Sequence, residues 1–235
     1  MSIEMLPVHG IGEITRGADL AGMIGSAVEL CDRDIVVVTQ KVVSKAEGAM
    51  VRIDATDPLS HKPVVEAESV RILRRRGDLV ISETKHGFVC ANAGIDLSNV
   101  ESGWAALLPE DPDRSARRIR DGLRGRFDVR VGVIVSDTFG RPWRRGVVDV
   151  AIGCAGLVPV LDLRGSTDAY GRTLQVTEVA LVDELAAAAE LVMGKATGVP
   201  AAVIRGGDPS WFLGDDDRGG VVADVVRHPS DDLFR

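Results

Sequence analysis

The spacing of hydrophobic and polar residues along the chain predicts a mixture of strands and helices. Ile35–Thr39 is a short apolar β-branched run, which is typical of a buried strand. Apolar residues recur every three or four positions in Asp19–Leu30 and in Val179–Val192, which predicts two helices, the second ended by Gly194. Val129–Val135 predicts another strand. Both kinds of element therefore contribute to the core.

The remaining segments complete an α+β pattern. We expect further helices over 63–76 and 113–126, strands over 79–81, 87–91, 201–204 and 221–226, a β-rich stretch over 147–163, and a loop over 206–220. Helices and strands do not alternate as they would in a doubly wound sheet. We therefore expect mixed sheets with helices in one unit spanning 1–235, with a smaller second lobe within about 65–190. Thr177 is expected to cap the helix that follows it.

Composition narrows the class of protein. Hydrophobic residues make up 45% of the 235 residues and charged residues 27%, which is typical of a globular protein. The net charge of −7 disfavours a nucleic-acid partner. The N-terminus does not resemble a signal peptide, and no run approaches the roughly 18 apolar residues that span a bilayer. The expectation is a cytoplasmic protein with no membrane partner.

Common catalytic and metal motifs are missing from the sequence. There is no GxxxxGK[ST] phosphate-binding loop, GxSxG nucleophile turn or HExxH zinc motif. The three cysteines form no CxxC pair, which excludes a zinc ribbon and a thioredoxin-type redox pair. The chemistry must therefore come from less general segments.

Two polar segments follow predicted strands. In residues 39–48, Lys41 and Lys45 stand among hydroxyl side chains that can bind phosphate, although an ordinary loop with solvated lysines is the better reading of composition alone. In residues 91–99, Asp96 and Asn99 offer oxygen ligands for Mg²⁺ or Mn²⁺, or else form an Asx turn.

A third segment favours function over structure. Asp137 is expected at the carboxyl end of its strand, with the Thr138 hydroxyl beside it and a cationic loop after it. That arrangement suits a metal ion and an anion, whereas the structural alternative is a salt-bridge loop. The loop contains Arg141, Arg144 and Arg145. Trp143 either stacks on a flat ligand or, as is commoner, fills the core.

Together these segments resemble one family. They occur in the order HGIGEI, TQKVVSKAEG, ANAGIDLSN, SDTFGRPWR, VDVAIGCAG, DAYGRTLQVTEVALVDELAAAAELVMGKATGVP and DDLFR. The set resembles the coenzyme F420:L-glutamate ligases, the CofE family, which includes the N-terminal ligase domain of mycobacterial FbiB. The resemblance covers roughly residues 6–206 and the last few residues.

The resemblance implies a GTP-dependent, GDP-forming ligase with a two-lobed fold and a homodimeric state. Such an enzyme adds L-glutamate to the F420 precursor, F420-0, through an acyl phosphate and extends a γ-glutamyl tail. It uses two divalent ions, Mg²⁺ or Mn²⁺, and K⁺. The nitroreductase-like domain that follows the ligase domain of the mycobacterial protein has no counterpart in this sequence, which is either the stand-alone form or an excised ligase domain. A reductase role is therefore not expected of it.

Residue by residue, the resemblance implies a site. Asp96 and Asp137 match metal-binding aspartates, Thr138 a second metal contact, and Lys45 joins the two aspartates in the catalytic set. The implied nucleotide contacts are Gly10, Ile11, Gly12, Glu13, Gln40, Lys45, Asn99 and Lys195. Gln40 departs from the serine common in the family, and residues 206–220 do not align. The charges of Arg141, Arg144 and Arg145 suit an anionic acceptor or glutamate.

Two other functions are compatible with the same residues. A metal-dependent phosphohydrolase could use Asp96 and Asp137 without an acceptor amine. A non-catalytic cofactor-binding or dimerisation module is the other alternative, and the presence together of both aspartates, Lys45 and Asn99 speaks against it.

Overall fold

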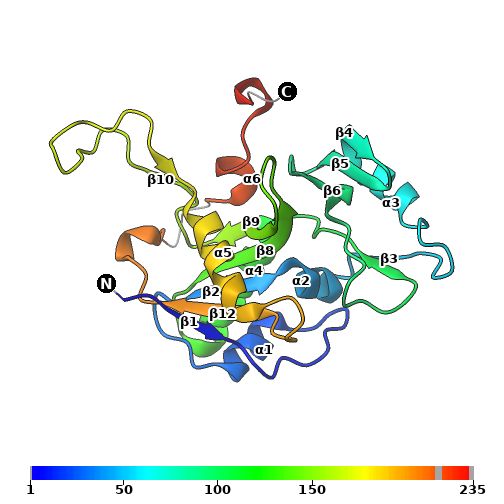
Figure 1. Cartoon of the computed structure of the whole chain (residues 1–235). Coiled ribbons are helices and arrows are strands. Elements are labelled where there is room, and N and C mark those ends of the chain that lie inside the picture. Colours follow the sequence, from blue (N-terminus) through cyan, green and yellow to red (C-terminus); the bar gives the residue numbers. More distant parts are fainter. Residues whose placement is uncertain (1, 215–218, 233–235) are drawn as a thin grey trace.

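A five-stranded mixed sheet forms the centre of the computed structural model, which describes residues 2–214 and 219–232 (Figure 1). Its strands run in the spatial order β1 (Glu4–Pro7), β12 (Ala201–Arg205), β2 (Ile35–Thr39), β8 (Gly132–Gly140) and β9 (Val147–Ala155). Only β2 and β8 pair in parallel, and the other neighbours are antiparallel. The centre of the sheet is thus a parallel pair, whose carboxyl ends lie together.

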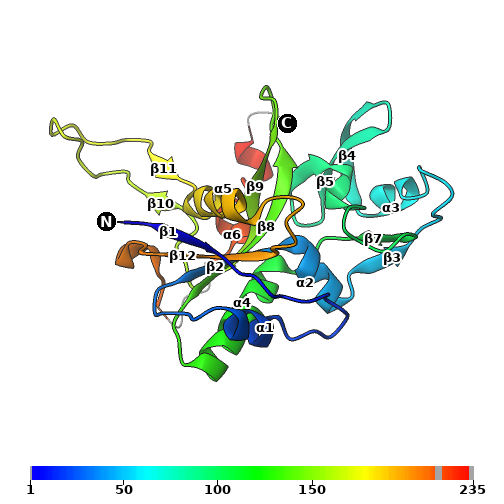
Figure 2. The same cartoon turned by 60° about the horizontal axis from the view of Figure 1, so that its bottom comes forward.

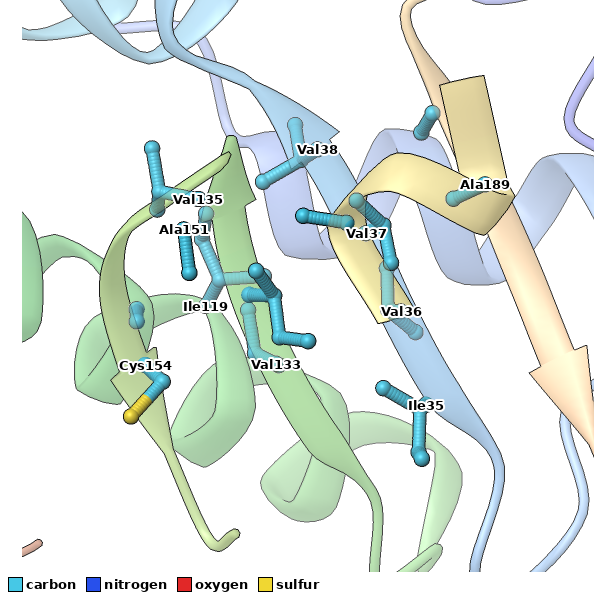
Figure 3. Packing of buried hydrophobic residues seen from close by; sticks show 14 of the residues in the cluster. Ile35, Val36, Val37, Val38, Ile119, Val133, Val135, Ala151, Cys154 and Ala189 are labelled. Carbon is cyan, nitrogen blue, oxygen red and sulfur yellow. The ribbon is translucent and has the colours of Figure 1, made fainter. Parts of the chain in front are cut away.

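Helices cover both faces of this sheet (Figure 2). Helix α5 (Leu181–Met193) lies on one face, and α4 (Pro112–Phe127) with α1 (Leu20–Ala27) lies on the other. The valines and isoleucines of β2 and β8 are buried between them (Figure 3), and Ile35, Val36 and Val37 have no exposed surface. Burying apolar side chains on both faces is why β2 reads as a continuous apolar run.

Two smaller sheets lie beside the central one. The first contains β4 (Ser69–Arg76), β5 (Leu79–Thr84) and β6 (Val89–Ala91), with α3 (Lys62–Ala67) against it. The second pairs β3 (Met50–Arg52) with β7 (Trp104–Ala106). The strands β8 and β9, by contrast, belong to the central sheet, and the division of the chain into lobes stays a prediction.

A hairpin arm extends from the body between β9 and α5 (Figure 1). Its base is the short antiparallel pair β10 (Leu161–Asp162) and β11 (Glu178–Val179). Tyr170 and Val176 on the arm are strongly exposed. After β12 the chain forms α6 (Val221–Asp224). None of the helices in the described part of the chain has both the length and the apolarity needed to cross a membrane.

Most of the predicted elements are confirmed. The strand β2 has the predicted bounds, and α1, α4, α5 and β12 lie within a few residues of the expected segments. Asp19 caps α1 by accepting a hydrogen bond from the backbone N–H of Gly22. The predicted pair of short strands is β5 and β6. The loop over 206–220 is described except for 215–218, and residues 233–235 of the terminal DDLFR also lie outside the described residues.

The helix predicted over 63–76 is wrong in its second half. Helix α3 ends at Ala67, and residues 69–76 form β4 instead. Arg76 and Leu79 are register partners, so Gly77 and Asp78 make a two-residue hairpin turn, and Gly77 has a φ of +57°. Pairing with β5 across this turn therefore outweighs the helical spacing.

The strand predicted over 221–226 is also wrong, because this segment begins as α6. The buried carboxylate of Asp113 accepts hydrogen bonds from the backbone N–H groups of Val221 and Val222, at the start of α6. A carboxylate at a helix N-terminus satisfies otherwise unpaired donors. Thr177 does not cap α5, which begins after Ala180, and its carbonyl accepts from Leu163 in the arm.

Candidate active site

The carboxyl ends of β2 and β8 place several polar segments together. Parallel pairing ends at Thr39 and Ser136, which lie opposite each other. Helix α2 (Gln40–Glu47) begins directly after Thr39, and β8 continues past Ser136 as a hairpin with β9. Asp137 was expected at the end of its strand, and β8 instead runs three residues further, to Gly140. Asp137 therefore directly follows the segment of β8 that pairs in parallel with β2, but it does not lie at the end of the strand.

A cavity of about 790 Å³ lies at this edge of the sheet. Its walls come from the loop before α1, from α2, from the segment around Asp96, from β8 and β9, and from the end of α5. The predicted site residues that line it are Ile11, Gly12, Glu13, Gln40, Lys45, Asp96, Asn99, Asp137, Thr138 and Lys195. Segments separated by more than a hundred residues therefore converge on one cavity. Gly10 and the three arginines are not among the lining residues.

Asp137 is half-buried on β8. Its withdrawal from water raises the pKa of its carboxyl group to about 7, opposed by a 2.8 Å hydrogen bond from the backbone N–H of Thr138. The nearby carboxylates of Asp96 and Asp149 also raise this pKa. A carboxylate in such surroundings favours a cation beside it.

The backbone of Asp96 is held by β-bridge hydrogen bonds to Ala106, and both oxygens of its carboxylate have partners. One oxygen lies 2.8 Å from the Lys41 ammonium, and the other accepts a 2.7 Å hydrogen bond from the backbone N–H of Ser98. Burial raises the pKa of Asp96, but these bonds together bring it below its usual value. Asp96 is thus an anion in the cavity wall.

Two predicted nucleotide contacts from α2 have different surroundings. The Lys45 ammonium lies 2.6 Å from the exposed Glu13 carboxylate, in a pair that solvent can reach. Gln40 is buried, and its Nε2 donates 2.6 Å hydrogen bonds to the Ser44 hydroxyl and to the carbonyl of Leu107. The Gln40 amide therefore fastens α2 to the segment after β7.

Two further charged residues, Asp149 and Glu190, line the cavity and were not predicted as site residues. Lys41, which was considered with Lys45 as a phosphate-binding candidate, lines it as well. Asp149 is the most informative, because it is only 2% exposed and accepts hydrogen bonds from Ser136, Thr138 and Lys195. Its signal in the sequence is a single acid within the apolar run VVDVAIG. A buried acid of this kind needs partners, which the run itself does not supply.

The donor set fits a hard divalent cation. Asp96, Asp137 and the Thr138 hydroxyl offer the oxygen ligands that Mg²⁺ and Mn²⁺ bind. Within residues 2–214 and 219–232, no three His, Cys, Asp or Glu side chains converge enough to hold a metal ion by themselves. An ion at the two aspartates would therefore take its remaining ligands from water or from substrate phosphates, as Mg²⁺ commonly does.

The arginine loop lies at the tip of the β8–β9 hairpin, between Gly140 and Val147. Arg141 donates a 3.1 Å hydrogen bond to the carbonyl of Arg145, which closes the loop. Trp143 is 85% exposed, so the expectation that it fills the core is wrong. The loop is thus a cationic tip outside the cavity wall.

Comparison with known proteins decides the family. Residues 10–206 match the family model described as F420-0:gamma-glutamyl ligase. The chain belongs to this family. The matched residues include every segment that lines the cavity.

Relatives in the F420-0:gamma-glutamyl ligase family match this chain over its whole length. It is 45% identical to the coenzyme F420:L-glutamate ligase of Methanothermobacter thermautotrophicus, with all of both chains covered. It is 43% identical to the protein of that name from Methanopyrus kandleri, over all of this chain and 98% of the relative. It is 42% identical to the one from Archaeoglobus fulgidus, over all of this chain and 97% of the relative.

Proposed function

We propose that this chain is a GTP-dependent ligase that joins L-glutamate to the terminal carboxylate of the F420 precursor F420-0 and extends a γ-glutamyl tail. The proposal rests on one observation: Asp96, Asp137 and Lys45 line the same cavity in a chain of this family. The names of the full-length relatives support the same substrates.

The reaction needs an activated carboxylate, because oxide is too poor a leaving group for an amine to displace. An oxygen of the acceptor carboxylate attacks the γ-phosphorus of GTP, and GDP leaves. The amine of glutamate then attacks the acyl phosphate, loses a proton to solvent and expels inorganic phosphate. Both steps depend mainly on positioning and on neutralising the phosphate charge.

Different residues of the cavity would position the substrates and neutralise the phosphate charge. Lys45 and Lys195 supply positive charge toward the phosphates, while Asp96 and Asp137 would hold a divalent cation, Mg²⁺ or Mn²⁺. That cation, when bound, stabilises negative charge on the phosphoryl oxygens. Gly12, Glu13 and Asn99 form the wall along which the rest of the nucleotide would lie. The requirement for K⁺ stays a prediction.

The acceptor needs cations of its own, since it carries a phosphodiester and a carboxylate. Arg141, Arg144 and Arg145 stand at a hairpin tip outside the cavity wall, so they are available to an acceptor that approaches from outside. We assign the acceptor to this tip and the nucleotide to the cavity.

The two-lobed homodimer is part of the same proposal, with the smaller sheets forming the second lobe. The arm between β10 and β11 exposes Tyr170 by 91% and Val176 by 84%, which suits a surface that a second copy covers. Light scattering on the eluting protein would give twice the mass of the 25.0 kDa chain. A monomer at micromolar concentration would contradict this part.

One experiment separates the ligase from its alternatives. Phosphate release from GTP is measured with Mn²⁺ present while glutamate and F420-0 are each left out. A ligase releases phosphate at its full rate only when both are present. A phosphohydrolase would release phosphate without glutamate, and a non-catalytic module would release none under any condition.

A further inference from the structure

The carboxylate of Asp149 has three donors from the chain itself. It is 2% exposed, and it accepts hydrogen bonds of 2.6 Å from the Thr138 hydroxyl and 3.2 Å from the Ser136 hydroxyl. The Lys195 ammonium lies 2.6 Å from the same carboxylate. A buried carboxylate with a cation and two hydroxyl donors is a stable arrangement, because removing the cation would leave a buried charge unpaired.

The backbone after α5 fixes the position of Lys195. Gly194 follows the helix with a φ of +62°, a conformation that glycine adopts readily, and turns the chain toward β8. The ammonium also contacts the Thr138 hydroxyl and lies 3.5 Å from the Glu190 carboxylate. Three side-chain oxygen acceptors, two of them anionic, therefore surround one ammonium group. Such a set of hard oxygens would otherwise suit a divalent cation.

The two other aspartates of the cavity, Asp96 and Asp137, differ from Asp149. Within the described residues, the Asp137 carboxylate makes no ion pair. Asp96 has one, with Lys41, but its side chain is 33% exposed, so that pair is partly hydrated. The Lys195 side chain is itself 52% exposed, so the two pairs differ in the burial of the carboxylate: Asp149 is 2% exposed and Asp96 33%. Removing the ammonium from Asp149 would leave a buried charge unpaired, which costs more than replacing the partner of a carboxylate that water reaches. Asp149 thus has its own cation, whereas Asp137 needs one.

We propose that the Lys195 ammonium, held by Asp149, Thr138 and Glu190, is a built-in cation of the nucleotide site, so that the site takes one divalent cation and not two. That single ion belongs on the side of Asp96 and Asp137. Asp149 is then a positioning residue, which acts through Lys195. This inference rests on the proposed nucleotide site and revises the expectation of two divalent ions.

Counting bound Mn²⁺ tests the inference directly. The full chain is titrated with Mn²⁺ in the presence of a saturating non-hydrolysable GTP analogue, and free Mn²⁺ is followed by electron paramagnetic resonance. The expected result for the unmodified protein is one bound ion per chain. Two bound ions per chain would overturn the inference while leaving the ligase proposal intact, and this comparison requires no variant to fold.

A variant tests whether Lys195 stands in the place of a second divalent ion. Lys195→Gln keeps a polar side chain but removes the positive charge, so a second Mn²⁺ is expected beside Asp149. The matched control is Lys85→Gln, because Lys85 also pairs with a carboxylate, that of Glu110, but does not line the cavity. The control should stay at one ion. A Lys195→Gln protein that folds, binds the analogue and still takes one ion would contradict the assignment.

Calorimetry with the analogue keeps the two proposals distinct. If the unmodified chain does not bind the analogue at all, the proposed nucleotide site is wrong and the inference about Lys195 is wrong with it. If the analogue binds and the count is two, only the inference about Lys195 is wrong.

Discussion

Thr138 on β8 and Asp149 on β9 lie opposite each other, and the Thr138 hydroxyl donates a 2.6 Å hydrogen bond to the Asp149 carboxylate. Their pairing depends on register, because a slip of one residue turns a side chain to the other face of a sheet. The register of this hairpin changes between Val135 and Ser136, just before the site. That irregularity sets which side chains of β8 and β9 meet in the cavity.

Replacing Asp137 tests the proposed metal ligand. Asp137→Asn should lower ligation by at least a hundredfold at saturating Mn²⁺, because an amide is a much weaker ligand for a hard cation than a carboxylate. The fold should persist, since asparagine has the same size and can still accept the N–H of Thr138. Product formation and thermal unfolding are measured together, with Asp121→Asn on the exposed surface of α4 as the control. Near-normal turnover of Asp137→Asn would exclude its role.

The arginine tip should serve the acceptor and not the nucleotide. Arg144→Ala should raise the KM for F420-0 severalfold and leave GTP affinity unchanged, because Arg144 does not line the cavity. The control is Arg118→Ala, which removes an exposed arginine from α4. If calorimetry shows a tenfold loss of GTP affinity, about 1.4 kcal/mol, while the KM for F420-0 is unchanged, the two roles are reversed.

Nucleotide choice is a separate prediction, which rests on the family and not on a visible guanine contact. The kcat/KM for GTP should exceed that for ATP by at least tenfold, which corresponds to about 1.4 kcal/mol of discrimination. Initial rates of product formation with each nucleotide, at the same Mn²⁺ concentration, measure it. Equal efficiencies would remove GTP specificity from the account and leave the ligase chemistry in place.

Stability should depend on the carboxylate that joins α4 to α6. Asp113 accepts backbone hydrogen bonds from Cys154, Val221 and Val222. Asp113→Ala leaves these donors without their acceptor, so the free energy of unfolding should fall by on the order of 3 kcal/mol. Asp111→Ala, which removes the exposed cap of the same helix and a 3.8 Å ion pair with Arg117, should lower it by about 1 kcal/mol. Urea unfolding of both variants measures the difference, and equal losses would contradict the role of Asp113.

The sequence predicts best where local spacing and burial agree. Ile35–Thr39 is apolar on both faces, and the structure buries it between helices on both sides. The prediction fails where strand pairing overrides the spacing of apolar residues. In β4 the helical spacing is overridden by the Gly77-Asp78 turn and by pairing with the next strand, β5. The Gly-Asp pair was an available signal for that hairpin.

The candidate site shows the same division. Parallel strands have their carboxyl ends at the same edge of a sheet, so side chains that follow β2 and β8 lie near one another. Asp137 and Lys45 line one cavity for this reason. Asp149 could not be placed in advance, because its partners Thr138 and Lys195 come from segments 11 and 46 residues away. Periodicity does not reveal which distant donors will satisfy a buried acid.

The mass of the product tests the proposed ligase activity most directly. The purified chain is incubated with F420-0, L-glutamate, GTP and Mn²⁺, and the deazaflavin species are resolved by mass spectrometry. The account predicts conversion of F420-0 into species heavier by one and then more glutamyl residues, with one GDP formed for each addition. The ligase proposal would be contradicted if F420-0 stayed unchanged in this incubation and GTP were consumed equally well when glutamate was left out.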